Sequence, residues 1–398
     1  MSKTQIAAIE FGTSKIVTIV AQNSGIDRLE FVGTGTVPYD GYQDGDWNTP
    51  GQMIQRTRDS IAAAELEAND KIKEIYVGVP GEYIHVLSAE AEIELTEEGV
   101  TEEALELVQD AAADELKIAE RGGLVLHRSP AWFQVDDGKK TMEPSGHGGV
   151  LRACTSFIVA DNNFIDDAKE ILGALDVTIL GFLSPTLGES LLLLSIDDRD
   201  RVSVLIDSGY LNTEISVIRG EAIIYHAVLP MGGGHITADL ATSLRIPMRA
   251  AEQIKRSYVF NPDEFDQDAL SEVYDARGRR LTFPRETVSK CVEKTMDELC
   301  DMIDMTLKHD ALELLGARSQ IYLTGGGIGM MRSARDYLAE KIGRPVKAAA
   351  PKTAKMNSPV YSSALGLMDL TFDSIERHDA SENGFGSKLF TGFLKKKK

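Results

Sequence analysis

The chain has 398 residues, of which 43% are hydrophobic and 26% charged, a mixture typical of a globular protein with more than one domain. Its formal charge of −20 argues against nucleic acid as a partner, because binding phosphates requires a cationic face. No apolar run reaches the roughly 18 residues of a membrane-spanning helix, and the start lacks a secretory signal, so we expect a cytoplasmic protein. The cysteines Cys154, Cys291 and Cys300 form no CxxC pair, which argues against a disulfide framework and a structural zinc site.

Two segments far apart in the chain share a pattern of strand, small-residue turn and strand, with β-branched residues on both arms. The arms are expected at residues 6–10 and 16–20, and again at 202–206 and 213–218. In each segment an acid, Glu10 or Asp207, stands at the end of the first arm, and a turn containing glycine follows. This weak internal repeat predicts two related α/β halves.

The stretch between these two hairpins alternates between helical and strand-like patterns, with one interruption. Helices are expected at 52–66, 164–175 and 186–194, and strands at 74–79 and 177–180. Residues 85–165 break the alternation with an acidic helix at 101–118, a strand at 123–127 and a glycine-rich loop at 145–149. We interpret them as a small inserted subdomain.

The second half of the chain continues the α/β order after its hairpin. A strand is expected at 221–229, helices at 236–244 and 248–258, and a polar excursion at 261–285. Apolar residues at near-helical spacing predict a long amphipathic helix over 285–315. A strand at 320–324 runs into a glycine triplet, and the polar residues 376–386, which lack periodicity, are expected to form a linker.

Turns of small residues are suited to phosphate, because several N–H donors can converge there without a side chain in the way. The turns after Glu10, at Asp207–Gly209 and at Gly325–Gly327 could supply three such surfaces. Each is a weak signal alone, since the chain contains neither GxxxxGK[ST] nor GxGxxG. The seven histidines form no ligand pattern and no GxSxG motif occurs, which argues against a histidine metal site and a serine hydrolase.

The order of these three turns is that of the nucleotide site in the actin and heat-shock-chaperone superfamily, and the chain resembles one of its families closely, the bacterial cell-division family FtsA. The motifs that carry the resemblance are AIEFGTSKIVTIVA, VLIDSGYLNTEISVI, LPMGGGHITADLATSLRIPMRAAEQIK, IYLTGGG and PVYSSALGLM. The inserted stretch matches through VTEEALELVQDA, HRSPAWFQVDDG and SGHGGVLRACTSFIVADNN. The resemblance covers essentially residues 6–370.

The resemblance implies an actin-like (ribonuclease-H-like) α/β fold with two lobes. It places subdomain IA at 1–84 and 166–200, the inserted subdomain IC at 85–165, subdomain IIA at 201–258, subdomain IIB at 259–318, the end of IIA with the return to IA at 319–375, a linker at 376–386 and a membrane-targeting amphipathic helix at 387–398.

The resemblance also implies ATP and Mg²⁺ as ligands. The positions that match the family's phosphate-binding residues are Gly12, Thr13, Ser14, Lys15, Asp207, Ser208 and Gly209. The positions that would lie by the adenosine or face the nucleotide are Gly325, Gly326, Gly327, Glu252 and Lys255, and Mg²⁺ would be held through water near Glu10 and Asp207. Because Glu252 and Lys255 are three residues apart they share a helix face, and a surface ion pair is the alternative interpretation.

Two features depart from the superfamily pattern. Glu10 replaces the usual Asp, and Tyr210 and Leu211 stand where the second turn usually has two glycines. Side chains at these two positions would narrow the space for a γ-phosphate. We therefore expect ATP binding with slow or negligible hydrolysis, and we assign no catalytic residue beyond the candidate Mg²⁺ positions.

In function, the resemblance implies a polymerising adaptor that tethers the FtsZ ring to the cytoplasmic face of the cell membrane at the division site. The C-terminal peptide of FtsZ is expected on the helix at 285–315, with Arg285, Glu293 and Glu298 as candidates, and the inserted subdomain is expected to contact neighbouring subunits and other divisome proteins. Two alternatives remain: an actin-like adaptor of type IV pilus assembly, which needs no amphipathic end, and a small-molecule kinase of the superfamily, which needs a catalytic acid and an interdomain pocket.

The last residues, 385–398, carry five lysines and no acid on an otherwise acidic chain. On a helical wheel the apolar residues fall on one half and the first lysines on the other: Phe385, Leu389, Phe390, Phe393 and Leu394, against Lys388 and Lys395. At roughly 1 kcal/mol per lysine near anionic lipid, one tail is expected to bind weakly and many tails on a filament strongly. A last helix docked on the body and a frayed end are the alternatives.

Overall fold

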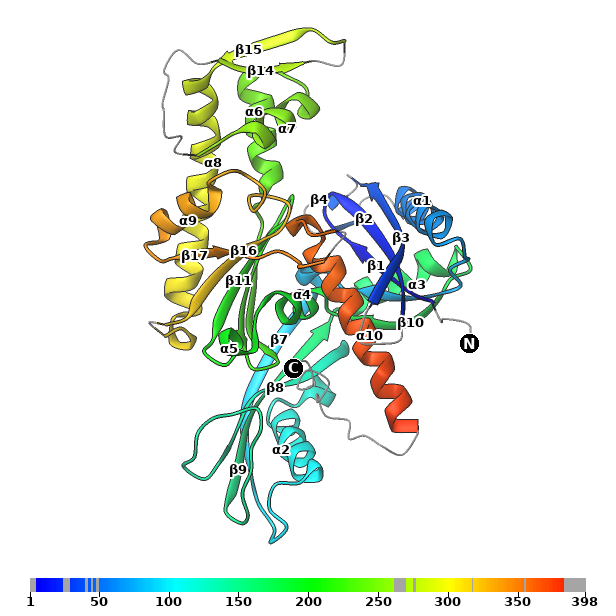
Figure 1. Ribbon diagram of the computed structural model, residues 1–398, viewed down its shortest axis with the longest axis vertical. Coiled ribbons are helices and arrows are strands. Elements are labelled where there is room, and N and C mark those ends of the chain that lie inside the picture. The colour runs from blue at the N-terminus through cyan, green and yellow to red at the C-terminus, as the bar shows by residue number, and fades with distance from the viewer. Residues whose placement is uncertain are drawn as a thin grey trace. The chain divides into compact units, whose positions relative to one another are not determined.

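The structure is a computed structural model and describes residues 5–23, 29–39, 42–43, 46–47, 50–260, 270–274, 277–316, 318–353 and 356–382. The chain forms two compact units (Figure 1). Unit 1 comprises Met1–Val202, Val217–His226 and Ser363–Lys398, and unit 2 comprises Ser203–Ser216 and Ala227–Ser362. Within the described ranges, no helix combines the length and the apolar character that crossing a membrane requires.

Unit 1 is built on a mixed five-stranded sheet with the order β10-β6-β1-β2-β3. Its strands are β1 (Gln5–Phe11), β2 (Lys15–Asn23), β3 (Leu29–Pro38), β6 (Glu74–Gly78) and β10 (Thr178–Leu183). The strands β1, β2 and β3 form an antiparallel meander, whereas β6 runs parallel to both β1 and β10. The apolar runs of β1 and β2 reflect burial of both faces, since Ile9, Ile16 and Ile19 are almost completely buried.

Helices cover this sheet closely where the sequence supplies glycine. The helix α1 (Pro50–Ala68) lies on β3, because a Cβ at Gly33 or Gly35 would overlap the backbone of α1. The helices α4 (Pro185–Leu193) and α10 (Ser362–Glu382) cross at Gly188 and Gly366, where a Cβ on either glycine would overlap the other helix. The remaining elements are α3 (Asn162–Gly173), α5 (Ile196–Arg199) and the short pair β4 (Tyr42–Gln43) and β5 (Asp46–Trp47).

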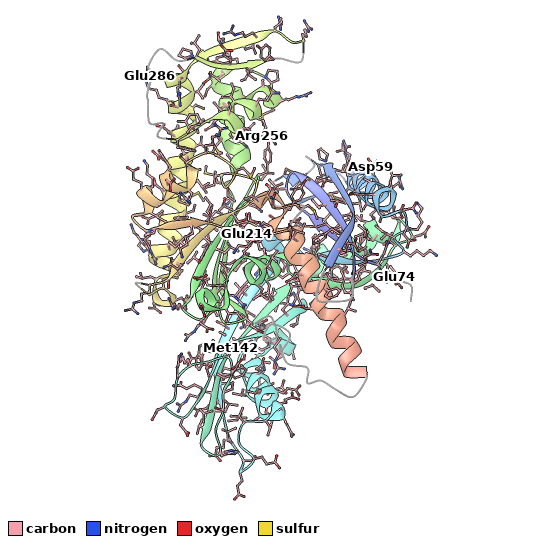
Figure 2. The ribbon with its side chains drawn as sticks, in the orientation of Figure 1. Asp59, Glu74, Met142, Glu214, Arg256 and Glu286 are labelled. Carbon is pink, nitrogen blue, oxygen red and sulfur yellow. The ribbon has the colours of Figure 1, made fainter. Side chains whose placement is uncertain are left out.

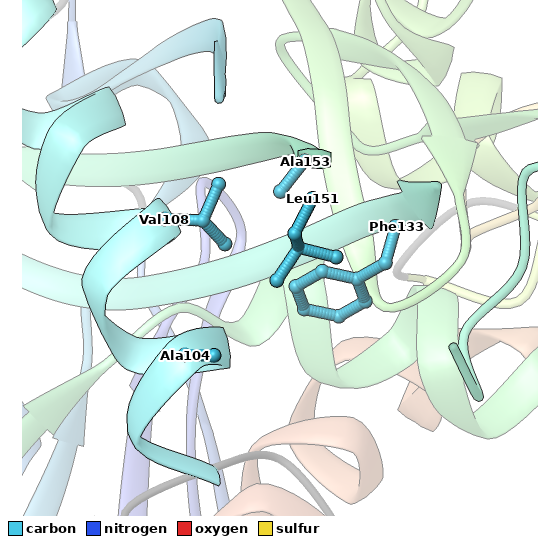
Figure 3. Close-up of a cluster of buried hydrophobic side chains, with 5 residues drawn as sticks. All are labelled: Ala104, Val108, Phe133, Leu151 and Ala153. Atoms are coloured by element: carbon cyan, nitrogen blue, oxygen red, sulfur yellow. The ribbon is translucent and has the colours of Figure 1, made fainter. Parts of the chain in front are cut away.

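The inserted subdomain is a three-stranded antiparallel sheet covered by one helix. Its strands β7 (Ile84–Glu94), β8 (Leu124–Val135) and β9 (Val150–Ala160) have the order β7-β9-β8. The helix α2 (Glu102–Glu115) begins after Thr101, whose hydroxyl accepts a hydrogen bond from Ala104 N–H at 3.1 Å. Its apolar side packs on the sheet in the core shown in Figure 3, formed by Ala104, Val108, Phe133, Leu151 and Ala153. Short 3₁₀ turns lie at Gly81–Tyr83 and Ile118–Glu120.

Residues 217–226 group with unit 1 because they bind it through several hydrogen bonds. Ser156 Oγ donates to Ile223 O at 2.5 Å, and His226 Nε2 lies 3.1 Å from Gly81 O. Burial lowers the pKa of His226 to about 4, because the cation would lose its hydration. The sequence-based division assigned these residues to 201–258; the finer, eight-part division stays a prediction.

A second five-stranded sheet has the order β13-β12-β11-β16-β17, and parts of β12 and β13 fall within residues 217–226, which group with unit 1. Its strands are β11 (Ser203–Ser208), β12 (Thr213–Arg219), β13 (Ala222–Leu229), β16 (Gln320–Thr324) and β17 (Val346–Ala348). Parallel pairing joins β11 to β16 and β16 to β17. The helices are α6 (Gly233–Leu244), α7 (Met248–Ser257), α8 (Arg285–Met305) and α9 (Ala334–Ile342), with short turns at Thr306–Asp310, Leu312–Leu314 and Pro359–Tyr361.

Three segments differ from what the sequence patterns predicted. The polar excursion contains a hairpin of β14 (Leu270–Tyr274) and β15 (Arg280–Pro284). The long helix expected to reach residue 315 ends at Met305, where a π-helical turn replaces the α-helical hydrogen bonds. The helix α10 runs to Glu382, so the first residues of the expected linker, 376–382, are helical.

Candidate functional site

The two turns that unit 2 contributes to the predicted site follow neighbouring parallel strands. The strands β11 and β16 pair with Asp207 opposite Thr324, so both turns begin at the same edge of the sheet. In open α/β sheets the carboxyl ends of parallel strands are the usual place for a ligand. The structure therefore brings together the predicted residues Asp207, Ser208, Gly209, Gly325, Gly326 and Gly327.

Close packing requires two of the three glycines after β16. A Cβ at Gly325 would overlap Asp207, and its φ of +91° favours glycine. A Cβ at Gly327 would overlap carbonyl oxygens of the loop after β11, and Gly327 N–H donates to Ser208 O at 2.6 Å. At Gly326 a Cβ would meet Val360, with Cγ2 at 3.3 Å and the backbone Cα at an ordinary 3.8 Å. The glycine triplet is therefore where the turn after β16 packs directly against the loop after β11. We call this contact of Gly325 and Gly327 with residues 207–209 the glycine seam.

The loop after β11 is also hydrogen-bonded to the N-terminus of α6. Gly233 N–H donates to Gly209 O at 3.0 Å, and Gly234 N–H donates to Tyr210 O at 2.6 Å. The sequence prediction did not assign these two glycines to the site. The signal that could have found them is the other glycine triplet of the chain, at 232–234.

Glu252 and Lys255 form a largely buried ion pair on α7. Lys255 Nζ lies 2.8 Å from Glu252 Oε2 and donates to Gly233 O at 3.0 Å, and the Lys255 side chain is only 3% exposed. Thr237 Oγ1 and Arg256 Nε donate to the two carboxylate oxygens of Glu252, at 2.6 and 2.8 Å. Figure 2 labels Arg256 on this helix. Lys255 is thus buried, whereas Arg256, the second cation on Glu252, is 76% exposed.

Glu252 and Lys255 each shift the pKa of the other in the direction that favours the charged form. Burial lowers the pKa of Lys255, and the hydrogen bond and charge of Glu252 oppose that shift. Burial would raise the pKa of Glu252, but Lys255 and the hydrogen bonds from Thr237 and Arg256 outweigh it and hold that pKa below its usual value. Each charge is therefore stabilised by the other and by contacts with α6.

Unit 1 contains the other predicted turn. It joins β1 to β2 at residues 12–15, where Gly12 N–H donates to Lys15 O at 3.0 Å. Burial raises the pKa of Glu10, while a hydrogen bond from Ser363 and the charge of Lys15 oppose the shift. The structure thus places Glu10 beside the turn Gly12, Thr13, Ser14 and Lys15, as the hairpin pattern predicted.

The two candidate Mg²⁺ positions are single carboxylates near the ends of strands. Among the described residues there is no group of three or more His, Cys, Asp or Glu side chains that could hold a metal. Mg²⁺ keeps several waters and is commonly bound by one or two carboxylates together with substrate phosphates. Glu10 is the penultimate residue of β1 in unit 1, and Asp207 is the penultimate residue of β11 in unit 2.

The candidates for peptide binding on α8 do not share one face. Tyr258 O–H donates to Glu293 Oε1 at 2.8 Å, so Glu293 is turned toward α7, whereas Glu298 lies 3.6 Å from Lys294. At about 100° per residue, Arg285 lies about 80° around the helix from Glu293, and Glu298 about 140° from it. The helix therefore groups Arg285 with Glu293 and leaves Glu298 on another side.

The predicted membrane-binding residues lie outside the described residues. They are Phe385, Lys388, Leu389, Phe390, Phe393, Leu394 and Lys395.

Comparison with known families and sequences points to one kind of protein. The model of the family "Cell division protein FtsA" matches residues 204–366. A protein of that name from Pseudomonas aeruginosa is 27% identical over 373 residues, which cover 91% of this chain and 88% of the relative. The proteins of that name from Neisseria meningitidis and Escherichia coli K12 are 25% and 24% identical, covering 91% and 98% of this chain and 89% and 97% of the relatives.

Comparison with solved structures confirms the actin-like α/β fold. The chain is similar to a protein of the PilM-PilN type IV pilus biogenesis complex, with a TM-score of 0.61, 16% identity and coverage of 93% of this chain and 98% of the other. It is also similar to MamK from a double helical filament, with a TM-score of 0.51, 15% identity and coverage of 92% and 98%. The structure of MreB 5 of Spiroplasma citri bound to AMPPNP matches with a TM-score of 0.50, 15% identity and coverage of 97% and 100%.

Proposed function

This chain is a relative of the FtsA cell division proteins and has an actin-like fold. We propose that it is an ATP-binding, polymerising adaptor that tethers the FtsZ ring to the cytoplasmic face of the cell membrane at the division site. The observation that carries the proposal is the glycine seam of unit 2, where the loop after β11, the turn after β16 and α6 meet at one sheet edge beside the buried pair Glu252–Lys255.

Binding of ATP with Mg²⁺ is the first part of the proposal. The seam supplies closely approaching backbone without side chains, which is the surface that phosphates and a nucleoside need. The MreB 5 relative in fold was solved with AMPPNP, an ATP analogue. We assign the phosphates to the turns at 12–15 and 207–209, and the adenosine to the side of Gly325–Gly327, Glu252 and Lys255.

Hydrolysis is expected to be slow or negligible. Tyr210 and Leu211 occupy the loop positions where glycines would leave room for a γ-phosphate. A phosphate-release assay on the purified protein checks this, and vigorous turnover would contradict it.

The FtsZ peptide is assigned to α8, on the side that carries Arg285 and Glu293. Because Glu298 lies on another side of the helix, we expect Arg285→Glu to weaken binding of the FtsZ C-terminal peptide and Glu298→Gln to have little effect. Fluorescence anisotropy of a labelled peptide measures both. Equal loss in the two variants would move the peptide site away from the assigned side.

Membrane attachment is assigned to the tail at 387–398. A single short amphipathic segment with a few lysines binds anionic lipid only marginally, whereas linked copies gain affinity because each later contact is intramolecular. This ties membrane recruitment to self-assembly, which we assign to this actin-like chain together with contacts of the inserted subdomain to other divisome proteins.

Co-sedimentation with vesicles that contain anionic lipid tests the tether. The full chain, a truncation after Glu382 and the double variant Leu389→Glu with Phe393→Glu are compared with and without ATP. The full chain should pellet more strongly with ATP, and the two altered proteins should stay in solution yet bind ATP. If all three pellet equally, the tail is not the tether.

The type IV pilus alternative has the structural similarity to the PilM-PilN complex in its favour. The whole-length relatives named for cell division favour the FtsZ adaptor instead. Binding of the FtsZ tail peptide discriminates between the two, because only the division adaptor should bind it. A screen for phosphate transfer from ATP to small acceptors tests the kinase alternative.

A further inference from the structure

Tyr210 lies against the N-terminal turn of α6. A Cβ at Gly234 would lie 2.8 and 2.9 Å from two carbons of the Tyr210 ring and 2.8 Å from Tyr210 O. Ordinary contact begins near 3.4 Å, so only glycine at position 234 leaves room for the ring and the loop backbone together. Lys255 Nζ lies 5.5 Å from the centroid of the same ring, within the range of a cation–π contact.

The backbone on either side of Tyr210 is hydrogen-bonded to two other segments of unit 2. Carbonyl oxygens of residues 208, 209 and 210 accept from Gly327 N–H, Gly233 N–H and Gly234 N–H, at 2.6, 3.0 and 2.6 Å. The side chain of Ser208 adds an acceptor for Ile328 N–H at 3.3 Å. The loop is therefore held to α6 and to the turn after β16 by hydrogen bonds within unit 2.

Lys255, the cation next to this loop, is likewise bound to partners within unit 2. Lys255 Nζ donates to Gly233 O and lies 2.8 Å from Glu252 Oε2, so its charge is balanced inside unit 2. A γ-phosphate bound at the loop 207–213 would have to draw the amides of Gly233 and Gly234 away from Gly209 O and Tyr210 O. Each exchanged hydrogen bond costs on the order of 1 kcal/mol, which removes much of the gain from the extra phosphate.

We propose that Tyr210 holds the loop 207–213 against α6, so that the site binds ATP and ADP with similar affinity and a bound nucleotide acts as a structural ligand whose γ-phosphate is not a switch. The inference rests on the proposed nucleotide binding and concerns what that binding discriminates. Exchanging ATP for ADP can shift the population of a protein state only if the two nucleotides differ in their preference for that state over the alternative. Loss of the γ-phosphate would then leave the loop, and whatever assembly depends on it, unchanged.

The test is the ratio of the dissociation constants for ADP and AMPPNP, measured by calorimetry with Mg²⁺ on the full chain. AMPPNP replaces ATP so that hydrolysis does not blur the comparison. For the wild type we expect a ratio within about threefold of one, a free-energy difference below about 0.7 kcal/mol. Preference for AMPPNP by about tenfold or more would overturn the inference.

Two variants disrupt the contact between the Tyr210 ring and Gly234, one on each side of it. Tyr210→Gly removes the ring, and Gly234→Ala places a methyl group where the ring lies. Both should raise the ratio toward AMPPNP by about threefold or more, because the freed loop can close on the γ-phosphate. Tyr210→Phe keeps the ring and should keep the wild-type ratio. Gly173→Ala, at a helix position with open space around it, is the matched control for a glycine-to-alanine change.

The outcomes separate this inference from the proposed function. If the wild type binds neither nucleotide, the proposed ATP binding itself fails. If the wild type binds both equally and neither Tyr210→Gly nor Gly234→Ala changes the ratio, nucleotide binding stands and the role of Tyr210 is refuted. Should Tyr210→Gly fail to fold, Gly234→Ala and Tyr210→Phe still give the ratio with and without the ring in place.

Discussion

The crossing of α4 and α10 makes a sharp prediction for Gly366→Ala. A Cβ at Gly366 would lie 2.6 Å from Glu189 Cα and still closer to Glu189 N. Ordinary contact begins near 3.4 Å, so the two helices would have to separate by about 1 Å. The side chains beside the crossing, Leu187 and Leu367, are almost completely buried, so the separation would open packed core.

The expected loss of stability follows from two opposing effects. Overpacking of this kind costs about 1–3 kcal/mol and sometimes more, because backbone rather than a flexible side chain must move. Alanine in a helix regains up to about 1 kcal/mol over glycine. We expect a net destabilisation of unit 1 by about 2 kcal/mol, which corresponds to a melting temperature lower by about 4–8 °C.

Thermal and urea unfolding of the full chain measure this change. Gly173→Ala is again the control, because nothing lies within 4 Å of a Cβ there and α3 should only gain from alanine. Unchanged stability of Gly366→Ala would mean that α4 and α10 do not approach each other as described, and the argument for a glycine-mediated crossing would be refuted.

Three further predictions concern single groups. Gly327→Ala should weaken nucleotide binding strongly, whereas Gly326→Ala should change it little; equal effects in calorimetry would refute the seam. Lys255→Met should cost about 3 kcal/mol in urea unfolding, because it leaves Glu252 partly buried with fewer partners, and wild-type stability would contradict the ion pair. Burial lowers the pKa of His226 to about 4, so between pH 7 and pH 5 the unfolded chain takes up a proton that the folded chain does not. The wild type should therefore lose up to about 2 kcal/mol more than His226→Gln over that range; parallel losses would exclude this role.

The sequence predicted the elements that depend on local patterns. The hairpins of both halves were visible because β-branched residues flank a small-residue turn, and α8 was visible from the spacing of its apolar residues. The hairpin of β14 and β15 was missed because its strands are only five residues long and lie in a polar, arginine-rich segment. The helical part of the expected linker was missed because polar residues carry no apolar periodicity there.

The resemblance supplied positions for the candidate site but not the hydrogen bonds between them. The structure brings the two predicted turns of unit 2 together at one sheet edge, and the sequence did not reveal that the loop carbonyls bind the amides of α6. Such contacts join residues far apart in the chain: Ser208 and Ile328, for example, are 120 positions apart. No local pattern encodes which amide a carbonyl will meet, because the answer depends on how complete strands and helices pack.

The length of α10 determines how a force on the proposed tether would be transmitted to unit 1. Figure 1 shows α10 extending away from its crossing with α4 at Gly366. From Gly366 to Glu382 the rise of an α-helix amounts to about 24 Å. Under the proposed attachment of residues 387–398 to the membrane, α10 would transmit a force to unit 1 as a lever that pivots at the crossing of Gly188 and Gly366. A force from the membrane or from the ring would therefore reach unit 1 as torque at that crossing. The closeness of the packing between α4 and α10 would then decide how stiffly a filament is held to the membrane.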